Sequence, residues 1–508
     1  MEMTGAQILM EALLREKVER VFGYAGATIC PAVDVLRATP QIGYTLVRTE
    51  QNAGHMASGY ARVTGQVPSH LLGRDIFQEV DITGAVTPFT KHTYLVKDAA
   101  QLPRIVKEAF YIASTGRPGP VLIDIPSDIQ EQVVPNVQFP ERAIIRGYNP
   151  SVRGNDKQIG NVAEAISKAQ RPVICAGGGV FLANAKEELA AFAVHTGIPV
   201  VTTMMGLSLL PTEDELNIGM IGAHGNACAN KALAKSDLLI MIGTRAADRA
   251  IISPDEIEKR MPSIHIDVDP AEIGKNMRAT VPLVGDVKVI LNQLMEKEIA
   301  VSCEAWRQML HEQRCAELER TWPERPDSVF PGRLLRLLGE RLSPDAAVCV
   351  DVGQNQLWAC KHLRLRGARL LTSGGLGTMG YSLPAAIGVK TAQPERQTLV
   401  VCGDGSFQMM MNELATVRAQ NMDLKIVLLR NGVLGLVHQI QNKAPYHGAF
   451  GVELQGDPDF AALAAAYGID SITVTEEEQM EEALDRLMAA KGSCLLIAQV
   501  SPQCCTTD

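Results

Sequence analysis

The sequence predicts an α/β protein with three doubly wound domains, each built on a parallel sheet. Short apolar runs typical of buried strands alternate with amphipathic runs typical of helices along the whole chain. The length of 508 residues fits about three domains of roughly 150 residues each. With 43 glycines and only 5% aromatic residues, the composition favours tight turns and close backbone approaches over an all-β sandwich.

Composition and charge argue against several classes of protein. Apolar residues make up 46% and charged residues 21% of the chain, which excludes wholesale disorder. A formal net charge of −9, without a run of Lys or Arg, argues against a nucleic-acid groove or an anionic membrane surface as a partner. The 11 cysteines form no C-x-x-C pair and the 10 histidines no H-x-x-x-H pair, so a zinc site has no support.

The start of the chain bears on where the protein is expected to act. Its first residues already form an amphipathic helix that runs into a strand, and no apolar run reaches about 18 residues. The cysteines are scattered and often flanked by apolar residues, as in reduced protein cores. We therefore expect a cytoplasmic protein without a signal peptide or membrane span.

The first predicted domain covers residues 1–130. Its strand-like runs lie at 20–24, 44–47 and 121–125, and its helix-like runs at 6–17, 52–63 and 102–114. The helix at 52–63 should lead back into a buried strand, yet Thr64–Val86 contains no apolar run and reads as a loop. This domain is therefore predicted to be one strand short.

The second predicted domain covers residues 155–296 and follows a linker at 130–150 that is rich in Pro and Gln. Its strand-like runs lie at 172–176, 199–202, 238–242 and 263–268. A polar helical connector at 297–328 leads to the third domain, residues 330–500. The strand-like runs of that domain lie at 347–351, 369–371, 398–402, 425–429 and 494–498.

Two polar side chains follow strand-like runs of the third domain. The run 398–402 ends at Gly403-Asp404-Gly405-Ser406, and Asn431 follows the run 425–429. If these strands are neighbours, Asp404 and Asn431 meet at their carboxyl ends, where open α/β sheets bind ligands. A carboxylate and an amide oxygen suit Mg²⁺, and the glycines and the following helix suit a diphosphate. The alternative is a plain strand-to-helix turn.

This pattern resembles the thiamine diphosphate signature, in which GDG-S is followed, after a helix and a strand, by N-N; here Arg430 replaces the first Asn. The resemblance extends over nearly the whole chain and is closest to the acetolactate synthases. It is carried by DVGQNQ at 351–356, SGGLGTMGYSLPAA at 373–386, NGVLGLVHQIQ at 431–441, RTEQNAGHMASGYAR at 48–62, GRPGPVLIDIPSD at 116–128, GTRAADR at 243–249 and HIDVDPAEI at 265–273.

The resemblance implies both a fold and a reaction. The three domains would be a pyrimidine-binding, a middle Rossmann-like and a diphosphate-binding domain, and the cofactors thiamine diphosphate and Mg²⁺. The implied reaction is decarboxylation of pyruvate and carboligation to a second 2-oxo acid, a step of branched-chain amino acid biosynthesis. A homodimer or homotetramer is implied, with which a regulatory small subunit can pair.

The resemblance also implies roles for individual residues. Glu50 matches the catalytic Glu that contacts the aminopyrimidine ring of the cofactor; the alternative is a carboxylate that complements the dipole of its own helix. Cofactor contacts are implied for Gly353, Gln354, Asn355, Gly377, Met379, Gly405, Ser406 and Leu434, and Mg²⁺ ligation for Asp404, Asn431 and the backbone of Val433. Positions near the substrate channel are implied for Gln66, Phe77, Gln78, Lys91 and Arg249. Lone basic residues are otherwise usually solvated surface.

The middle domain resembles the FAD-binding domain of the acetolactate synthases. The implied flavin positions are Gly177, Gly178, Gly179, Arg245 and Asp267. The family's R-F-D-D-R stands here as Arg245-Ala246-Ala247-Asp248-Arg249 and so lacks an aromatic and an acidic residue. A Rossmann-like spacer without a nucleotide is the alternative.

One departure from the family affects the first domain. Relatives carry several dozen residues between the positions of Gly65 and Gln66, whereas here these residues are adjacent. An internal deletion there would remove core strands. Three alternatives stay open: another thiamine diphosphate-dependent decarboxylase or carboligase, a catalytically impaired paralogue, and an oxidoreductase, since Gly375–Gly380 spells G-x-G-x-x-G.

Overall fold

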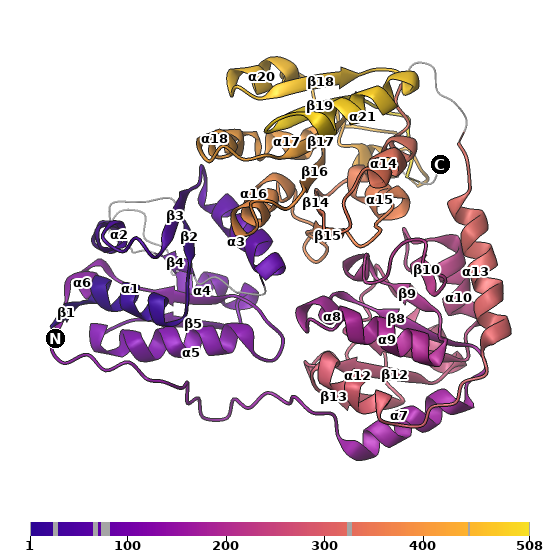
Figure 1. Ribbon diagram of the computed structural model, residues 1–508, viewed down its shortest axis with the longest axis horizontal. Coiled ribbons are helices and arrows are strands. Elements are labelled where there is room, and N and C mark those ends of the chain that lie inside the picture. Colours follow the sequence, from indigo (N-terminus) through magenta and orange to yellow (C-terminus); the bar gives the residue numbers. More distant parts are fainter. Residues whose placement is uncertain are drawn as a thin grey trace. The chain divides into compact units, whose positions relative to one another are not determined.

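The computed structural model describes residues 2–23, 29–64, 70–72, 82–322, 328–445 and 448–506. The chain divides into two compact units, residues 1–150 and residues 151–508. The second unit contains two parallel six-stranded sheets, and the first contains smaller sheets (Figure 1). The predicted α/β class is confirmed.

The C-terminal sheet of the second unit has the strand order β15-β14-β16-β17-β19-β18 and is parallel throughout. Its strands are β14 (Ala347–Val350), β15 (Arg369–Thr372), β16 (Thr398–Gly403), β17 (Lys425–Arg430), β18 (Asp470–Val474) and β19 (Cys494–Gln499). Its helices are α14 (Pro331–Glu340), α15 (Gln354–His362), α16 (Ser382–Ala392), α17 (Asp404–Gln408), α18 (Leu414–Ala419), α19 (Gly435–Gln441), α20 (Phe460–Ala466) and α21 (Met480–Ala489).

The strand order places a topological switch point in this sheet. The chain passes from β14 outward to β15, and then returns to β16 on the other side of β14. Ligands of open α/β sheets bind at the carboxyl ends of the strands where the order reverses. The ends of β14 and β16 carry Gly353-Gln354 and Asp404, so these residues lie at that point.

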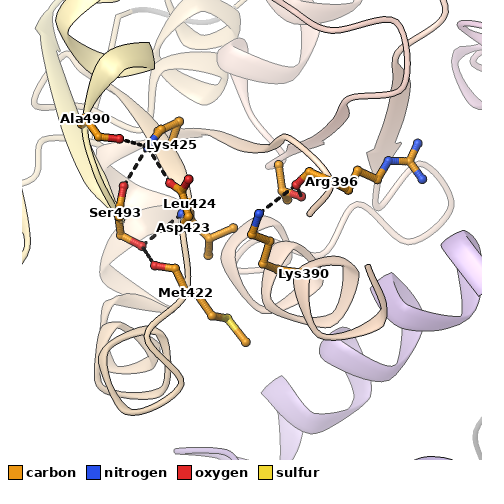
Figure 2. A network of polar contacts seen from close by, with 10 residues as sticks. Lys390, Arg396, Met422, Asp423, Leu424, Lys425, Ala490 and Ser493 are labelled. Atoms are coloured by element: carbon orange, nitrogen blue, oxygen red, sulfur yellow. Dashed lines mark hydrogen bonds and ion pairs between the residues drawn. The ribbon is translucent and has the colours of Figure 1, made fainter. Parts of the chain in front are cut away.

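A buried lysine fixes the opposite end of β17. The ammonium group of Lys425 donates hydrogen bonds to Asp423 Oδ1 at 2.5 Å and to the carbonyl oxygens of Ala490 and Gly492 at 2.7 Å each. Ser493 donates to the carbonyl oxygen of Met422 through its hydroxyl. These contacts join the turns that precede β17 and β19, as Figure 2 shows.

The middle sheet has the order β10-β9-β8-β11-β12-β13, again parallel, with its switch point between β8 and β11. Its strands are β8 (Pro172–Ala176), β9 (Val200–Thr202), β10 (Asn217–Met220), β11 (Leu238–Ile242), β12 (Ser263–Asp267) and β13 (Val281–Val284). Its helices are α7 (Asp156–Lys168), α8 (Gly178–Leu182), α9 (Lys186–Thr196), α10 (Ala227–Lys235), α11 (Pro254–Arg260), α12 (Val287–Met295) and α13 (Glu304–Leu318).

The described residues of the first unit form three small sheets. The strands β2 (Arg20–Gly23) and β3 (Gly43–Leu46) form a parallel pair, and β1 (Met3–Thr4) pairs antiparallel with β7 (Val133–Val134). A parallel sheet has the order β4-β6-β5, with β4 (His70–Leu72), β5 (His92–Leu95) and β6 (Val121–Asp124). The helices are α1 (Gly5–Arg15), α2 (Cys30–Arg37), α3 (Glu50–Thr64), α4 (Ile82–Val86), α5 (Leu102–Ser114) and α6 (Ser127–Glu131).

The loop predicted over Thr64–Val86 is wrong at two places, because β4 and α4 lie within it. The strand β4 has only three residues and pairs with β6, whose residues are all buried. A run this short gives no recognisable period in the sequence. Within the described part of this unit, β2 and β3 pair with each other and not with the β4-β6-β5 sheet.

Candidate functional site

The structure brings Asp404 and Asn431 together at the ends of β16 and β17. These strands are parallel neighbours, with Gly403 opposite Leu429. The carboxylate of Asp404 accepts hydrogen bonds through Oδ2 from the backbone N–H groups of Asn431 at 2.9 Å and Gly432 at 2.6 Å. The turn that carries Asn431 is therefore held directly on the aspartate.

The carboxyl group of Asp404 is only 2% exposed. Burial raises its pKa, and nearby Asp457 adds to this, while the N–H groups of Gly432, Asn431 and Gly405 act in the opposite direction. In the described part of the chain, its hydrogen bonds come from backbone N–H groups, and no Lys or Arg side chain forms an ion pair with it. A bound cation would therefore favour the ionised carboxylate.

The side chain of Asn431 is also oriented by its neighbours. Its Oδ1 accepts a hydrogen bond from the N–H of Val433 at 3.1 Å, and its Nδ2 donates to Oε1 of Gln354 at 3.2 Å. The turn continues through Leu434, whose N–H donates to the carbonyl oxygen of Val452. Asp404, Asn431 and Val433 thus belong to one small cluster of oxygen-bearing groups.

Glycines allow the backbone to approach closely around this cluster. A Cβ on Gly405 would lie 2.9 Å from Cδ2 of Leu434 and 3.7 Å from Cε of Met379. Gly353 and Gly377 have φ angles of +144° and +68°, which glycine adopts readily. Gly405, Leu434 and Met379, for which the resemblance implied cofactor contact, therefore lie side by side at this edge.

Asp351, the residue after β14, has a structural role that the sequence motif DVGQNQ alone did not predict. Asp351 is fully buried, and its carboxylate accepts hydrogen bonds from the N–H groups of Val352, Gly380 and Ser382 and from the Ser382 hydroxyl. It thereby holds the turn before α16 against the end of β14. An aspartate that directly follows an apolar run was the signal available.

The glycines predicted for a flavin site lie at the switch point of the middle sheet. A Cβ on Gly177 would lie 2.3 Å from the carbonyl oxygen of Gly243, and one on Gly179 would lie 2.7 Å from Gly243 Cα. These glycines therefore let the loops after β8 and β11 touch. Gly178 faces Met205 in the same region, Arg245 is exposed, and Asp267 is buried at the end of β12.

The substrate-channel residues lie in different parts of the chain. Lys91 donates to the carbonyl oxygens of Ile112 and Thr115 and to the hydroxyl of Tyr148, so its ammonium group ties the start of β5 to the end of α5. Arg249 is exposed, 3.9 Å from Asp248. Gln66, Phe77 and Gln78 lie outside the described residues, and Glu50 is the first residue of α3.

The described residues were also considered as a possible membrane span or a carboxylate, histidine or cysteine metal site. None of their helices is both long and apolar enough to cross a membrane. They contain no group of three or more His, Cys, Asp or Glu side chains placed to hold a metal ion. A cation at Asp404 would therefore need amide, backbone and ligand oxygens as well as the carboxylate.

Comparisons with known proteins match three family models. A model described as thiamine pyrophosphate enzyme, N-terminal TPP binding domain, matches residues 3–74. The central domain model of the same family matches residues 159–294, and its C-terminal TPP binding domain model matches residues 351–498. Together they cover more than half of the chain.

Several curated proteins are similar over almost the full length. The acetolactate synthase large subunit of Corynebacterium glutamicum is 39% identical over 531 residues, covering 95% of this chain and 84% of the relative. The acetolactate synthase of Arthrospira platensis is 37% identical over 546 residues, covering 98% and 94%. Both alignments are longer than the 508 residues of this chain, so the relatives carry internal residues without a counterpart here.

Proposed function

This chain belongs to the thiamine pyrophosphate enzyme family and is an acetolactate synthase-like enzyme, and on that premise we propose how its own residues serve the reaction. The proposed reaction is decarboxylation of pyruvate and transfer of the remaining two-carbon unit to a second 2-oxo acid. Thiamine diphosphate, when bound, supplies the electron sink for the carbon–carbon bond cleavage.

The observation that carries this proposal is the contact between Asp404 and the Asn431 turn at the switch point of the C-terminal sheet. The donor set is a buried carboxylate, an amide oxygen and backbone oxygens, which suits Mg²⁺ bound together with phosphate oxygens. The residues therefore fit a magnesium–diphosphate group. Asp404, Asn431 and the backbone of Val433 are the proposed magnesium ligands.

We propose the remaining cofactor contacts for residues at the same carboxyl ends of the strands of the C-terminal sheet. The proposed diphosphate contacts are the backbone around Gly353, Gln354, Asn355, Gly405 and Ser406, and the proposed contacts near the aminopyrimidine are Gly377, Met379 and Leu434. Glu50 is the proposed carboxylate that exchanges a proton with the aminopyrimidine ring. The resemblance implies that Ile440, which is half exposed on α19, replaces the acceptor-site Trp of the family, and we propose that the second 2-oxo acid meets this aliphatic side chain.

FAD is proposed for the switch point of the middle sheet. The hydroxyl groups of Thr202 and Thr244 are buried at the carboxyl ends of β9 and β11 without a hydrogen-bond partner in the described structure. Arg245, which directly follows Thr244, is an exposed cation that suits a diphosphate. Flavin absorbance in the purified protein, lost when Arg245→Glu is introduced, tests this proposal.

The proposed assembly is a homodimer or homotetramer that acts in the cytoplasm and can pair with a regulatory small subunit. The term large subunit in the names of relatives supports the last part of this proposal. Sedimentation of the purified chain tests the homo-oligomer.

The decisive experiment is acetolactate formation from pyruvate by the full chain with thiamine diphosphate and Mg²⁺. Asp404→Ala should lower the rate by at least about 100-fold, because the buried carboxylate is the proposed charged ligand of the ion. Asp470→Ala, an exposed aspartate on the edge strand β18, is the matched control and should retain activity. If the parent protein forms no acetolactate, or if Asp404→Ala is as active as the parent, the proposal is wrong.

A further inference from the structure

A chain of buried side-chain amides connects Asn431 to the segment Cys504–Thr506. Gln354 receives the hydrogen bond from Asn431 Nδ2 and donates through Nε2 to Oε1 of Gln439 at 2.9 Å. The same Nε2 donates to the carbonyl oxygen of Cys504 at 2.9 Å. Gln439 is 8% exposed, and Gln354 and Thr506 are more deeply buried. Water is therefore largely excluded from these contacts.

Backbone groups determine the direction of the hydrogen bonds that link the side-chain amides of Asn431, Gln354 and Gln439. The carbonyl oxygen of Cys504 can only accept, so Gln354 must present its Nε2 to it. Oε1 of Gln354 then faces Asn431, which must offer Nδ2. The N–H of Thr506 can only donate, and it points at Oε1 of Gln439 at 3.0 Å.

The result is a fixed orientation of the Asn431 amide. Because Nδ2 is engaged with Gln354, Oδ1, which accepts from the N–H of Val433, is the atom of the amide that keeps a lone pair for a cation. A reversed amide would place N–H donors where a cation must bind, and would set Oδ1 against the Oε1 acceptor of Gln354. The orientation of this proposed ligand therefore depends on residues outside the site as well as on the N–H of Val433 within it.

A glycine leaves space for the contact. A Cβ on Gly435, the first residue of α19, would lie 2.0 Å from Oε1 of Gln354 and 2.6 Å from Nδ2 of Asn431. A methyl group there would displace both partners of the hydrogen bond. The segment Cys504–Thr506 is itself held by α15, since Lys361 Nζ donates to the carbonyl oxygen of Thr506 at 2.8 Å.

We propose that Gln354, Gln439 and the segment Cys504–Thr506 are positioning residues, which orient the Asn431 amide so that its oxygen faces Mg²⁺. This inference rests on the proposed function, because it assigns an outer layer of partners to the proposed magnesium ligand. Such partners commonly change metal affinity by about 10–100-fold when they are removed.

The test is calorimetric titration of Mg²⁺ into the full chain saturated with thiamine diphosphate. Gly435→Ala and Gln439→Leu should each weaken Mg²⁺ binding by about 10–100-fold. Gln439→Glu should bind Mg²⁺ nearly as the parent does, because a carboxyl oxygen still accepts from Gln354 and Thr506. Gly160→Ala is the matched control, since Gly160 is an exposed helical glycine with open space around its Cβ position.

Thermal unfolding without Mg²⁺ and cofactor separates positioning from a general loss of stability. If these residues only stabilise the fold, the loss of Mg²⁺ affinity should be proportional to the loss of melting temperature across all four variants. Unchanged Mg²⁺ binding in both Gly435→Ala and Gln439→Leu would overturn the inference while leaving the proposed function in place. A parent protein that binds no Mg²⁺ with thiamine diphosphate would overturn both.

Discussion

The β2–β3 pair of the first unit and the C-terminal sheet of the second differ in how many strands share one core. In the C-terminal sheet, six parallel strands pair in one continuous order, and β14, β16 and β17 are buried along nearly their whole length. In the first unit, β2 and β3 form a pair of their own, and only one residue of each is buried.

This difference shows that the number of strands in a parallel sheet determines how many of them are protected on both edges and both faces. A central strand is paired on both sides and covered on both faces, so its backbone and side chains are protected together. A two-stranded parallel pair leaves an unpaired edge on each strand, and small sheets of this kind are marginal without further packing. An internal deletion between Gly65 and Gln66, which the resemblance implies, would therefore lower the stability of the first unit.

Hydrogen exchange should show the largest difference between the two regions. Amide protons of β14 and β16 should exchange at least about 1,000-fold more slowly than those of β2 and β3, because buried central strands open only with global unfolding. Mass-spectrometric exchange on the full chain measures both regions in one sample. Equal protection in the four strands would show that the first unit is as cooperative as the second.

A matched pair of leucine substitutions should show a smaller difference. Leu399→Ala, in β16, should cost about 2–5 kcal/mol of unfolding free energy, because Leu399 is fully buried between paired strands. Leu46→Ala, in β3, should cost less than about 1 kcal/mol, since its side chain is 46% exposed. Urea unfolding of each variant, monitored by hydrogen exchange of the unit that carries the substitution, measures the two losses of unfolding free energy. Similar costs would contradict the difference in burial.

The smallest expected effect is a pH dependence confined to the second unit. Burial lowers the pKa of His362, at the end of α15, from 6.5 to about 4, with Lys361 and Arg320 adding to the shift. Because the unfolded chain binds the proton more tightly, the stabilisation from the neutral ring is present above pH 6.5 and is lost as the pH falls toward 4. The loss should amount to about 1–3 kcal/mol, at about 1.4 kcal/mol per pKa unit.

His362→Phe keeps an aromatic ring beside Trp322, whose ring centroid lies 5.0 Å away, and removes the titrating group. The variant should therefore lose less stability than the parent between pH 6.5 and 4. Thermal unfolding of the two proteins across this range measures the effect. Identical pH profiles would show that His362 is not the group responsible.

The sequence predicted the strands with continuous apolar runs but not those interrupted by glycine, proline or polar residues. The continuous apolar runs of β8, β11, β16 and β17 were located to within a residue at either end. The strands β10, β13 and β18 were missed, because NIGM contains a glycine, VPLV a proline and DSITV a polar alternation that also fits a loop.

In the candidate site, too, only the features that a local sequence pattern encodes could be predicted. The meeting of Asp404 and Asn431 could be predicted, because parallel neighbouring strands bring their carboxyl ends to one edge. The amide chain from Asn431 through Gln354 to Gln439 could not, since it joins α15 and α19 with residues beyond β19. No local pattern encodes hydrogen bonds between segments so far apart in the chain.

The contacts of Lys425 at the start of β17 (Figure 2) bear on the position of Asn431, which follows the other end of the strand. If β17 slipped by one residue against β16 and β19, the ammonium group of Lys425 would move away from the carbonyl oxygens of Ala490 and Gly492. The same slip would turn every later side chain of the strand to the other face of the sheet. The lysine thus favours the register that brings Asn431 to Asp404, although it lies at the opposite end of the strand.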